Sequence, residues 1–428
     1  MSLGHETVGL RRAREKRARA NRFLEGKPLI VGLDLGKGKH AAVFGGLDLV
    51  PIRRFMVPHS LEGVGRLLEE AERDRVAGGF DRVIVFFEPT SHFWQNVANV
   101  LDARGIDYRT VASLGVERHR EIEHLTYAKG DYRDAVLILQ MGGRGQWLRR
   151  LLHADPLWLE LRTLSYEHEL LLELETAERL RVRSFVELVL PEFFDYFDDP
   201  LKLTARTLLK VLATGTPATF QALLESAAQV TGHRLRVSKI KALTARLATN
   251  ARFGVERLLG PTLVRVGLAI DRYELLSHQR SGIRKRLVAL YEKTPYRVSL
   301  ETIPGVGPEN HALLLGLVGD PKQYDRSTCL VKLAGAEPRE NHSGMGEGSH
   351  SISRRGSSRL RHLLHRIVLG LRSHNKEFSA YLARLQKRDA SPLKFHQAAV
   401  ATGNKYLRLV FRLCVAGARY DATKLGSR

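Results

Sequence analysis

Four carboxylates near the start of the chain have the types and the placement that a magnesium site requires. Asp34 lies near the end of an apolar segment, and Glu88 directly follows a second one. Asp131 and Asp134 are three residues apart, so they share a face if the segment is helical. Such oxygen ligands can hold two Mg²⁺ ions about 4 Å apart and clamp a scissile phosphate. The set predicts metal-assisted phosphodiester chemistry, although each acid alone is equally typical of a surface carboxylate or a helix cap.

A second chemical feature is Ser343, which precedes Gly344 in a polar loop. A serine in such a loop is ordinarily a turn residue. Its setting is unusual because basic residues follow on the loop and on a predicted helix, namely Arg354, Arg355, Arg359 and Arg361. A hydroxyl close to several arginines could attack a phosphate whose charge they hold. We therefore expect Ser343 to act as a nucleophile, with a turn residue as the alternative.

An α/β unit would bring the four acids together. Short links between predicted strands at Leu29–Leu33, His40–Phe44 and Val50–Val57 suggest an antiparallel meander. A helix capped by Ser60 and ended by Gly78 and Gly79 follows. The next predicted elements are a strand, Arg82–Phe87, a helix that Thr90 or Ser91 caps and that runs through Ala103, and a short strand, Tyr108–Val111. A meander followed by alternating helix and strand is the ribonuclease-H-like order.

The whole chain reads as α/β plus α. Residues 1–28 form a basic arm, and residues 29–150 form the α/β domain. Residues 151–295 are predicted to be helical or coiled coil, with a helical insertion at about 191–260. Residues 296–428 form a last, mainly helical domain, in which two helices, roughly Arg359–Ser373 and Phe395–Ala416, follow a loop rich in glycine and serine.

The charge balance indicates a polyanionic partner. Lys and Arg number 68 against 46 Asp and Glu, a formal net charge of +22 on 428 residues. Neutralised phosphates release condensed counterions, so nucleic acid is the expected partner. No apolar run approaches the roughly 20 residues that span a bilayer. The two cysteines cannot form a disulfide framework and fit a reducing cytoplasm.

The segment from Ile303 to Pro308 reads Ile-Pro-Gly-Val-Gly-Pro and resembles the hairpin of helix-hairpin-helix modules. There, glycines such as Gly305 and Gly307 let backbone N–H groups approach a phosphate at a helix start. A short Gly-Pro turn between helices is the alternative.

Several blocks in order resemble the DEDD-type insertion-sequence transposases, which are bridge-RNA-guided serine recombinases. In the first domain the blocks are Gly32-Leu33-Asp34 with Lys39-His40, then Phe87-Glu88-Pro89-Thr90, then Lys129-Gly130-Asp131-Tyr132-Arg133-Asp134-Ala135. In the last domain they are Ile303 to Gly307, Leu333-Ala334-Gly335, Pro338-Arg339-Glu340, Ser343-Gly344 and the basic stretch from Ile352 to Leu363. The resemblance covers residues 29–140 and 300–415.

This resemblance implies a Holliday-resolvase-like (RuvC-like) domain with the tetrad Asp34, Glu88, Asp131 and Asp134 holding Mg²⁺. It also implies that Ser343 forms a phosphoserine link to DNA. The expected partners are donor DNA, target DNA, a structured bridge RNA and further copies of the chain, as dimers that assemble into a tetramer. The expected nucleic-acid contacts are Lys39, Gly305, Gly307, Arg339, Arg354, Arg355, Arg359 and Arg361. The expected place of action is the cytoplasm, at the nucleoid.

The chain departs from the family pattern in places. Gly130 stands where threonine is usual, Glu337 where an apolar residue is frequent, and Ser357-Ser358 where asparagine is common. The segment 191–260 is longer than in compact members. These differences bear on RNA contacts and target choice more than on chemistry.

Other functions stay open on the sequence alone. A structure-selective nuclease of resolvase type would use the acids to activate water, with Ser343 merely structural. A non-catalytic nucleic-acid-binding protein would explain the charge without the chemistry. An actin-like sugar kinase would share the segment Gly32 to Gly36, but no second phosphate loop accompanies it, and the net charge is wrong for that class.

Overall fold

The computed structural model describes residues 18, 20–89, 91–124, 130–147, 155–214, 238–239, 241–243, 253–341, 349–389 and 391–425. The chain divides into two compact units, Met1–Asp155 and Pro156–Arg428. Each unit is described by itself below. No helix in the described part of the chain is both long enough and apolar enough to cross a membrane.

The first unit is built on a mixed five-stranded sheet of order β3-β2-β1-β4-β5. Its strands are β1 (Leu29–Leu35), β2 (Lys39–Gly45), β3 (Pro51–Pro58), β4 (Val83–Phe87) and β5 (Asp107–Thr110). The first three pair antiparallel, as the short links between them predict, and β4 and β5 continue parallel to β1. This sheet, followed by a mostly helical chain, is consistent with the expected ribonuclease-H-like domain.

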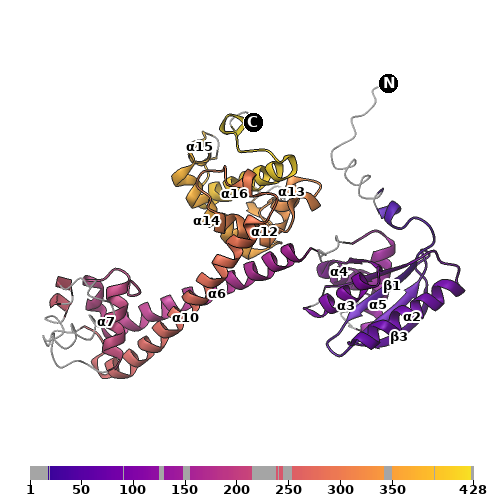
Figure 1. The fold of residues 1–428 in the computed structure, drawn as a ribbon, viewed down its shortest axis with the longest axis horizontal. Helices are drawn as coiled ribbons and strands as arrows, with labels where there is room; N and C mark the ends of the chain where they lie inside the picture. The colour runs from indigo at the N-terminus through magenta and orange to yellow at the C-terminus, as the bar shows by residue number, and fades with distance from the viewer. Residues whose placement is uncertain are drawn as a thin grey trace. The chain divides into compact units, whose positions relative to one another are not determined.

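Helices cover both faces of this sheet (Figure 1). On one face, α2 (Leu61–Ala77) and α3 (Phe93–Ala103) pack on odd-numbered strand residues such as Val31, Val85 and Phe87. On the other, α5 (Asp131–Gly143) packs on even-numbered residues such as Ile30, Ile84 and Phe86. Because successive strand side chains point to opposite faces, this alternation fixes which face each neighbouring residue shares.

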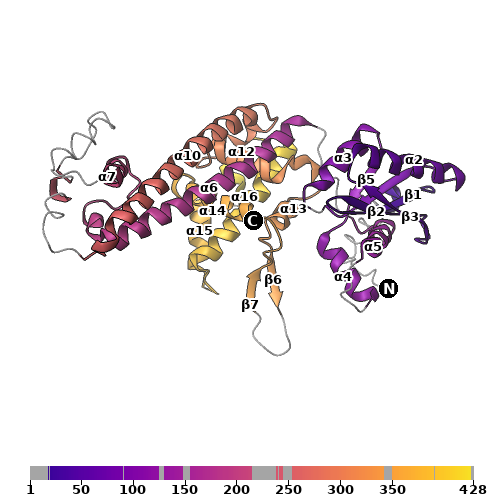
Figure 2. The same ribbon diagram turned by 90° about the horizontal axis from the view of Figure 1, so that it is seen from below.

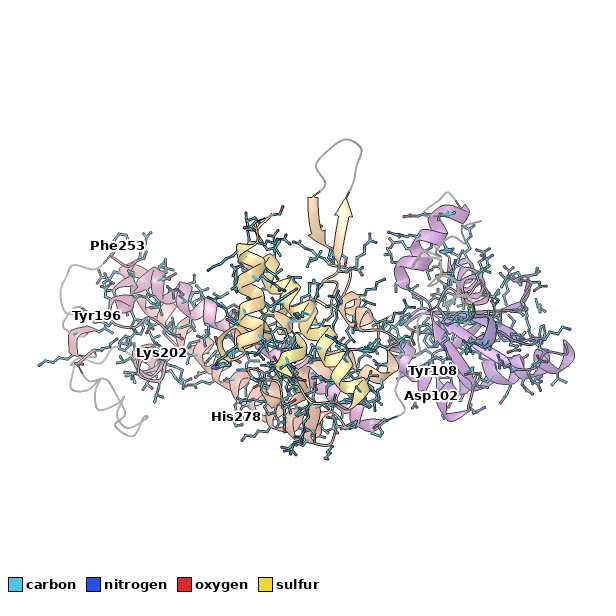
Figure 3. All side chains as sticks on the ribbon, turned by 90° about the horizontal axis from the view of Figure 1, so that it is seen from above. Asp102, Tyr108, Tyr196, Lys202, Phe253 and His278 are labelled. Atoms are coloured by element: carbon cyan, nitrogen blue, oxygen red, sulfur yellow. The ribbon has the colours of Figure 1, made fainter. Side chains whose placement is uncertain are left out.

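The helix boundaries follow local capping. The Ser60 hydroxyl accepts from the Gly63 N–H at 3.0 Å, and α2 ends before Gly78, as predicted. The expected cap of α3 at Ser91 is wrong, since the helix begins after His92 while Ser91 has a φ of 50°; Thr90 lies outside the described residues. At the other end of α3, Asp102 accepts a 3.3 Å hydrogen bond from Tyr108 of β5 (Figure 3).

The second unit contains two long helices, α6 (Pro156–Val189) and α10 (Leu259–Glu292), which pack antiparallel (Figures 1 and 2). Acids of α6 that interrupt its apolar spacing pair with arginines of α10. Glu175 binds Arg280 at 2.6 Å, and Glu178 binds Arg272 at 3.0 Å. These carboxylates are about 6% exposed. Glu178 also binds Arg181 at 2.5 Å, whereas loss of Arg280 would leave the buried Glu175 without its partner.

At one end of this pair, α7 (Leu203–Thr214) completes a separate apolar cluster. Its members come from α6, from the segment after α6 and from α10, and they include Phe193, Leu208 and Ile270. This cluster therefore includes part of the segment predicted to be an insertion. Of residues 191–260, the structure describes 191–214, 238–239, 241–243 and 253–260.

Near the opposite end of α6 and α10, these two helices and the helices that follow them form the largest apolar cluster among the described residues. The helices that follow α10 are α11 (Arg297–Leu300), α12 (Pro308–Val318), α13 (Ser327–Leu333), α14 (Ser358–His374), α15 (Lys376–Lys387) and α16 (Phe395–Ala416). The two helices predicted after the glycine-rich loop are confirmed as α14 and α16, but the sequence analysis missed α15, which lies between them. It begins where the Asn375 side chain, which is buried, accepts from the Phe378 N–H at 3.1 Å.

A buried charged network joins α6 to α12 and α14. The His168 ring is fully buried, with its two nitrogens 3.4 Å from Glu169 and Glu309. Arg366 of α14 binds Glu169 at 2.6 Å. Burial disfavours charge on His168, but hydrogen bonds and attraction from the two carboxylates outweigh it and raise its pKa. The network therefore favours the protonated form of His168 relative to an isolated buried histidine.

Candidate active site

Asp34 and Glu88 occupy adjacent positions at one edge of the sheet. β1 and β4 are parallel, and the last paired residues in their register are Leu33 and Phe87. The next residues toward the carboxyl ends are Asp34, within β1, and Glu88, which directly follows β4. Neighbouring strands lie about 4.8 Å apart. Both have the even parity of Ile30 and Phe86, so both belong to the face that α5 covers. The predicted pairing of these two positions follows directly from the register.

Helix α5 delivers the other two acids to the same edge. It runs antiparallel to β1, since a Cβ at Gly32 would meet the Ala135 carbonyl oxygen at 2.2 Å, whereas Gly143 lies by Ile30. The first turn of α5, with Asp131 and Asp134, therefore lies toward the carboxyl end of β1. The absence of a side chain at Gly32 is what lets the helix come this close.

The two aspartates of α5 differ in their surroundings. Asp131 is exposed, whereas the Asp134 side chain is 3% exposed. Arg120 of α4 (Ser113–His124) holds Oδ1 of Asp134 with Nε and Nη2, each at 2.8 Å. The sequence does not reveal that Arg120 pairs with Asp134, because this pairing depends on how α4 and α5 pack.

Histidines near this edge form a hydrogen-bonded chain on the opposite face. His40 is fully buried on β2, and its Nε2 lies 2.9 Å from Nδ1 of His59. The other nitrogen of His59 lies 3.2 Å from the Asn96 amide of α3. Burial, with a smaller effect of His59, lowers the pKa of His40 to about 4. These hydrogen bonds connect the start of β2, the end of β3 and α3. His40 therefore has the structural role typical of a buried histidine.

We call the edge of the sheet near Asp34, Glu88, Asp131 and Asp134 the acid edge. Its carboxylate oxygens suit a hard divalent cation, because Mg²⁺ prefers oxygen ligands of this kind. In the described part of the chain, no three His, Cys, Asp or Glu side chains are grouped closely enough to hold an ion. The four acids are therefore not gathered into one ion-binding group in this conformation, and Asp134 takes its counter-charge from Arg120 instead. A cluster of carboxylates that lacks a cation needs such compensation.

The second predicted centre belongs to the other unit. β6 (Pro338–Asn341) and β7 (Ser349–Ile352) form an antiparallel hairpin (Figure 2). Ser343 falls between these strands in the chain and lies outside the described residues, as do His342 and Gly344. The side chain of Arg339 also lies outside them.

The base of this hairpin is tightly fixed. Gly335, with a φ of 60°, lies against Gly356, and a Cβ at Gly335 would meet the Gly356 nitrogen at 2.8 Å. Arg361 of α14 donates to the Ala334 carbonyl at 2.9 Å and to the Gly356 carbonyl at 3.2 Å. Asn404 of α16, which is buried, donates to the Ala336 carbonyl at 2.8 Å. Sequence reasoning missed Asn404, since only its packing reveals this contact.

The predicted nucleic-acid contacts fall into two groups. Lys39, Arg354 and Arg355 are exposed. Arg359 and Arg361 are half-buried and have partners within the chain. Arg359 lies 3.7 Å from Glu173 and over the Tyr166 ring of α6, while Arg361 binds the hairpin base.

The two glycines of the hairpin-like motif also differ. Gly305, with a φ of 88°, packs on α14, where an added Cβ would meet the Gly370 carbonyl oxygen at 2.8 Å. Gly307 is exposed at the start of α12 with open space around it. Glu309 in the first turn binds Arg284 at 2.8 Å and places a carboxylate near this helix start. Gly305 therefore has a packing role, and Gly307 is the more accessible of the two.

Comparisons with known proteins match both units. A family model described as Transposase, for the DEDD transposases of IS110 type, matches residues 31–191. One described as the Transposase IS116/IS110/IS902 family matches residues 298–383. The chain is also similar to the insertion element IS110 uncharacterized 43.6 kDa protein of Streptomyces coelicolor. The two are 23% identical over 408 residues, which cover 92% of this chain and 96% of that protein.

Proposed function

The chain belongs to the IS110-type DEDD transposases of insertion sequences, and from this premise we propose that it recombines DNA through a phosphoserine at Ser343, with Mg²⁺ assistance. Membership implies cleavage of DNA and transfer of its strands. Transposases of this DEDD family typically depend on divalent metal. The observation that supports the proposal most is the adjacent placement of Asp34 and Glu88 on the face covered by α5.

In this proposal the acids of the first unit serve the phosphate. Asp34, Glu88, Asp131 and Asp134 would hold Mg²⁺, which supplies charge stabilisation at the scissile phosphate when bound. The main chain of Asp34 is held by its pairing with Ala41 of β2, and Glu88 directly follows the last paired residue of β4. Asp134 is oriented through its Oδ1 by Arg120, and Asp131 is exposed at the start of α5.

Ser343 would carry out the covalent step. Its hydroxyl oxygen attacks the phosphorus and loses its proton, the bond from phosphorus to the leaving sugar oxygen breaks, and that oxygen takes up a proton. A sugar hydroxyl of the second DNA end then attacks the phosphoserine, which restores the serine. The fixed base of the hairpin supports this role, because a nucleophile needs a defined position relative to its phosphate.

A structured bridge RNA would select the sequences. Base pairing of the RNA with donor and target DNA would read sequence, while the protein would bind the backbones. A net charge of +22 suits such a division of tasks. Dimers that assemble into a tetramer would combine acids and serine from different copies at nucleoid DNA in the cytoplasm.

Replacement of the nucleophile tests the proposal. Ser343→Ala should abolish strand transfer on a donor–target DNA pair with bridge RNA, while RNA affinity stays near that of the parent protein. Ser351→Ala, which removes an exposed hydroxyl from β7, is a matched control and should retain activity. Full strand transfer by Ser343→Ala would remove the nucleophile assignment.

A denaturing gel separates this mechanism from simple hydrolysis. A phosphoserine intermediate leaves DNA covalently attached to the parent protein, and the adduct is absent from Ser343→Ala. Metal-dependent cleavage without any adduct would instead identify a structure-selective nuclease.

A further inference from the structure

A basic hollow lies between α15 and α16 in the second unit. It has a volume of about 300 Å³ and is lined by residues that include Tyr381, Arg384 and Lys405. None of these residues belongs to the acid edge or to the serine hairpin described above.

Tyr381 holds two cations in this hollow. The Lys405 ammonium lies 4.2 Å from the centre of the Tyr381 ring, and the Arg384 guanidinium lies 5.3 Å from it. An aromatic face attracts cations, so the ring keeps these like charges close together. The arrangement concentrates positive charge at one place on the surface.

The charges in this hollow repel one another. Burial, and then the nearby charges of Arg384 and Arg412, lower the pKa of Lys405. The carboxylate lining the hollow, Glu377, also accepts a hydrogen bond from the Tyr420 hydroxyl at 3.2 Å. A bound anion would relieve the repulsion that the Lys405 ammonium experiences from these two guanidinium groups.

A second basic hollow adjoins the first along α15, and Ala380 lines both. It has a volume of about 510 Å³, and its lining includes Arg372, His374 and Lys376. Two further small residues of α15, Ser379 and Ala383, line the second hollow. Together the two hollows form a strip along α15, with basic residues lining each of them.

We infer that this α15 strip binds the phosphodiester backbone of a nucleic-acid strand, with phosphates of one strand in each hollow. A linear polyanion fits two adjoining cation groups, whereas a single small anion would use only one. Small residues along the strip allow a sugar-phosphate chain to approach the helix closely. The inference rests on the proposed function in one respect, that nucleic acid is the partner of this unit.

Salt dependence of binding tests the strip without any catalysis. Each phosphate neutralised by a protein cation contributes about 0.9 to the slope of log binding constant against log salt concentration. The full-length Lys376→Ala/Lys405→Ala variant loses one cation from each hollow. The magnitude of its slope should therefore be smaller than that of the parent protein by about 2. Lys285→Ala, which removes an exposed charge from α10, should leave the slope near that of the parent.

The titrations use a DNA duplex in one arm and a structured RNA hairpin in the other, both in chelator. A reduced slope with DNA assigns the strip to DNA, and a reduced slope with RNA assigns it to the guide. Unchanged slopes of the variant with both DNA and RNA overturn the inference. A variant that loses affinity only for polyglutamate also overturns it, because that result would indicate an acidic protein partner. Thermal unfolding checks the fold, and Lys376→Gln/Lys405→Gln, which keeps more of each side chain, replaces the alanine variant if that variant unfolds.

The outcome stays separable from that of the proposed function. Strand transfer by the parent protein reports on the serine mechanism, whereas the salt slope reports on the strip. A parent protein that transfers strands but shows no slope change in the variant would retain the proposed function and lose only the strip.

Discussion

Arg120 binds a single oxygen of Asp134, with both Nε and Nη2 at 2.8 Å from Oδ1. The Asp134 side chain is 3% exposed, so this pair compensates a carboxylate that is largely removed from water. The remaining oxygen, Oδ2, is the one through which Asp134 would serve a cation. The positively charged partner of the acid edge is thus part of the fold.

Removal of this partner should destabilise the first unit and make it more dependent on metal. Arg120→Ala should lower the free energy of unfolding by about 2 to 4 kcal/mol in chelator, because the Asp134 charge loses its partner. Mg²⁺ should restore more stability to this variant than to the parent protein, since the ion supplies the missing charge. Thermal unfolding with and without Mg²⁺ measures both effects.

Arg118→Ala is the matched control, because Arg118 is exposed on the same helix. It should behave like the parent in both conditions. An equal response of all three proteins to Mg²⁺ would show that Arg120 does not compensate a cation site.

Neutral isosteres of the two strand acids should separate catalysis from folding. Asp34→Asn and Glu88→Gln keep the side-chain shape but remove the charge that a divalent cation requires. Each should lower strand cleavage at least about 100-fold and reduce the stabilisation by Mg²⁺, with little loss of stability in chelator. Undiminished cleavage in chelator by the parent protein would contradict the metal role of this edge.

Gly32→Ala should displace the helix that carries Asp131 and Asp134. Its Cβ would approach the Ala135 carbonyl oxygen to 2.2 Å and the Leu139 nitrogen to 2.7 Å, and neither main-chain atom can rotate away. We expect a loss of about 1 to 3 kcal/mol in unfolding free energy, together with weaker Mg²⁺ stabilisation.

Denaturant titration of the Gly32→Ala variant measures this loss. The matched control is Gly38→Ala, because a Cβ at Gly38 meets nothing within 4 Å. Equal stability of the two variants would mean that α5 does not need its close approach to β1.

The buried His40 should make the first unit sensitive to acid. Burial, then His59, lowers its pKa from 6.5 to about 4, so the unfolded chain binds a proton between these values while the folded chain does not. Stability is therefore complete above pH 6.5 and falls as the pH decreases toward 4, by on the order of 3 kcal/mol in total. Chemical unfolding at a series of pH values measures the slope.

His40→Gln removes the titrating group and should flatten this slope relative to the parent protein. His311, whose pKa burial lowers to about 3, contributes in the same direction in the second unit and is common to both proteins. Parallel pH profiles for parent and variant would contradict the assignment to His40.

The sequence predicts those features that local patterns determine. The meander and the adjacent ends of β1 and β4 follow from apolar segments and short links, and they place Asp34 beside Glu88. The Ser60 cap and the glycine stop after Ala77 follow from helix-end chemistry. These features need no knowledge of distant contacts.

Features that depend on packing were not predicted. The pair of Arg120 with Asp134 requires two helices to meet at one angle, and nothing in either segment specifies the partner. Helix α15 was missed because its cap, Asn375, directly follows the preceding helix, so the boundary appears only as a short change of direction. Arg361 was predicted to contact nucleic acid because it belongs to a basic stretch, but its closest partners are carbonyl groups of its own chain.

This last difference leads to a test of Arg361 as a positioning residue. Arg361→Ala should slow strand transfer about 10-fold or more, because loss of the bonds to the Ala334 and Gly356 carbonyls loosens the hairpin that carries Ser343. Unfolding free energy should fall by about 1 to 3 kcal/mol, since the carbonyls of the buried Ala334 and the exposed Gly356 lose a charged donor. The slope of log DNA affinity against log salt should stay that of the parent, because no phosphate contact is removed.

Arg355→Ala, at an exposed position of the same turn, is the comparison, and there a phosphate contact predicts a slope of smaller magnitude with unchanged stability. A lower slope for Arg361→Ala with parental stability would instead assign Arg361 to the DNA or RNA backbone and leave the hairpin base to Gly335, Gly356 and Asn404.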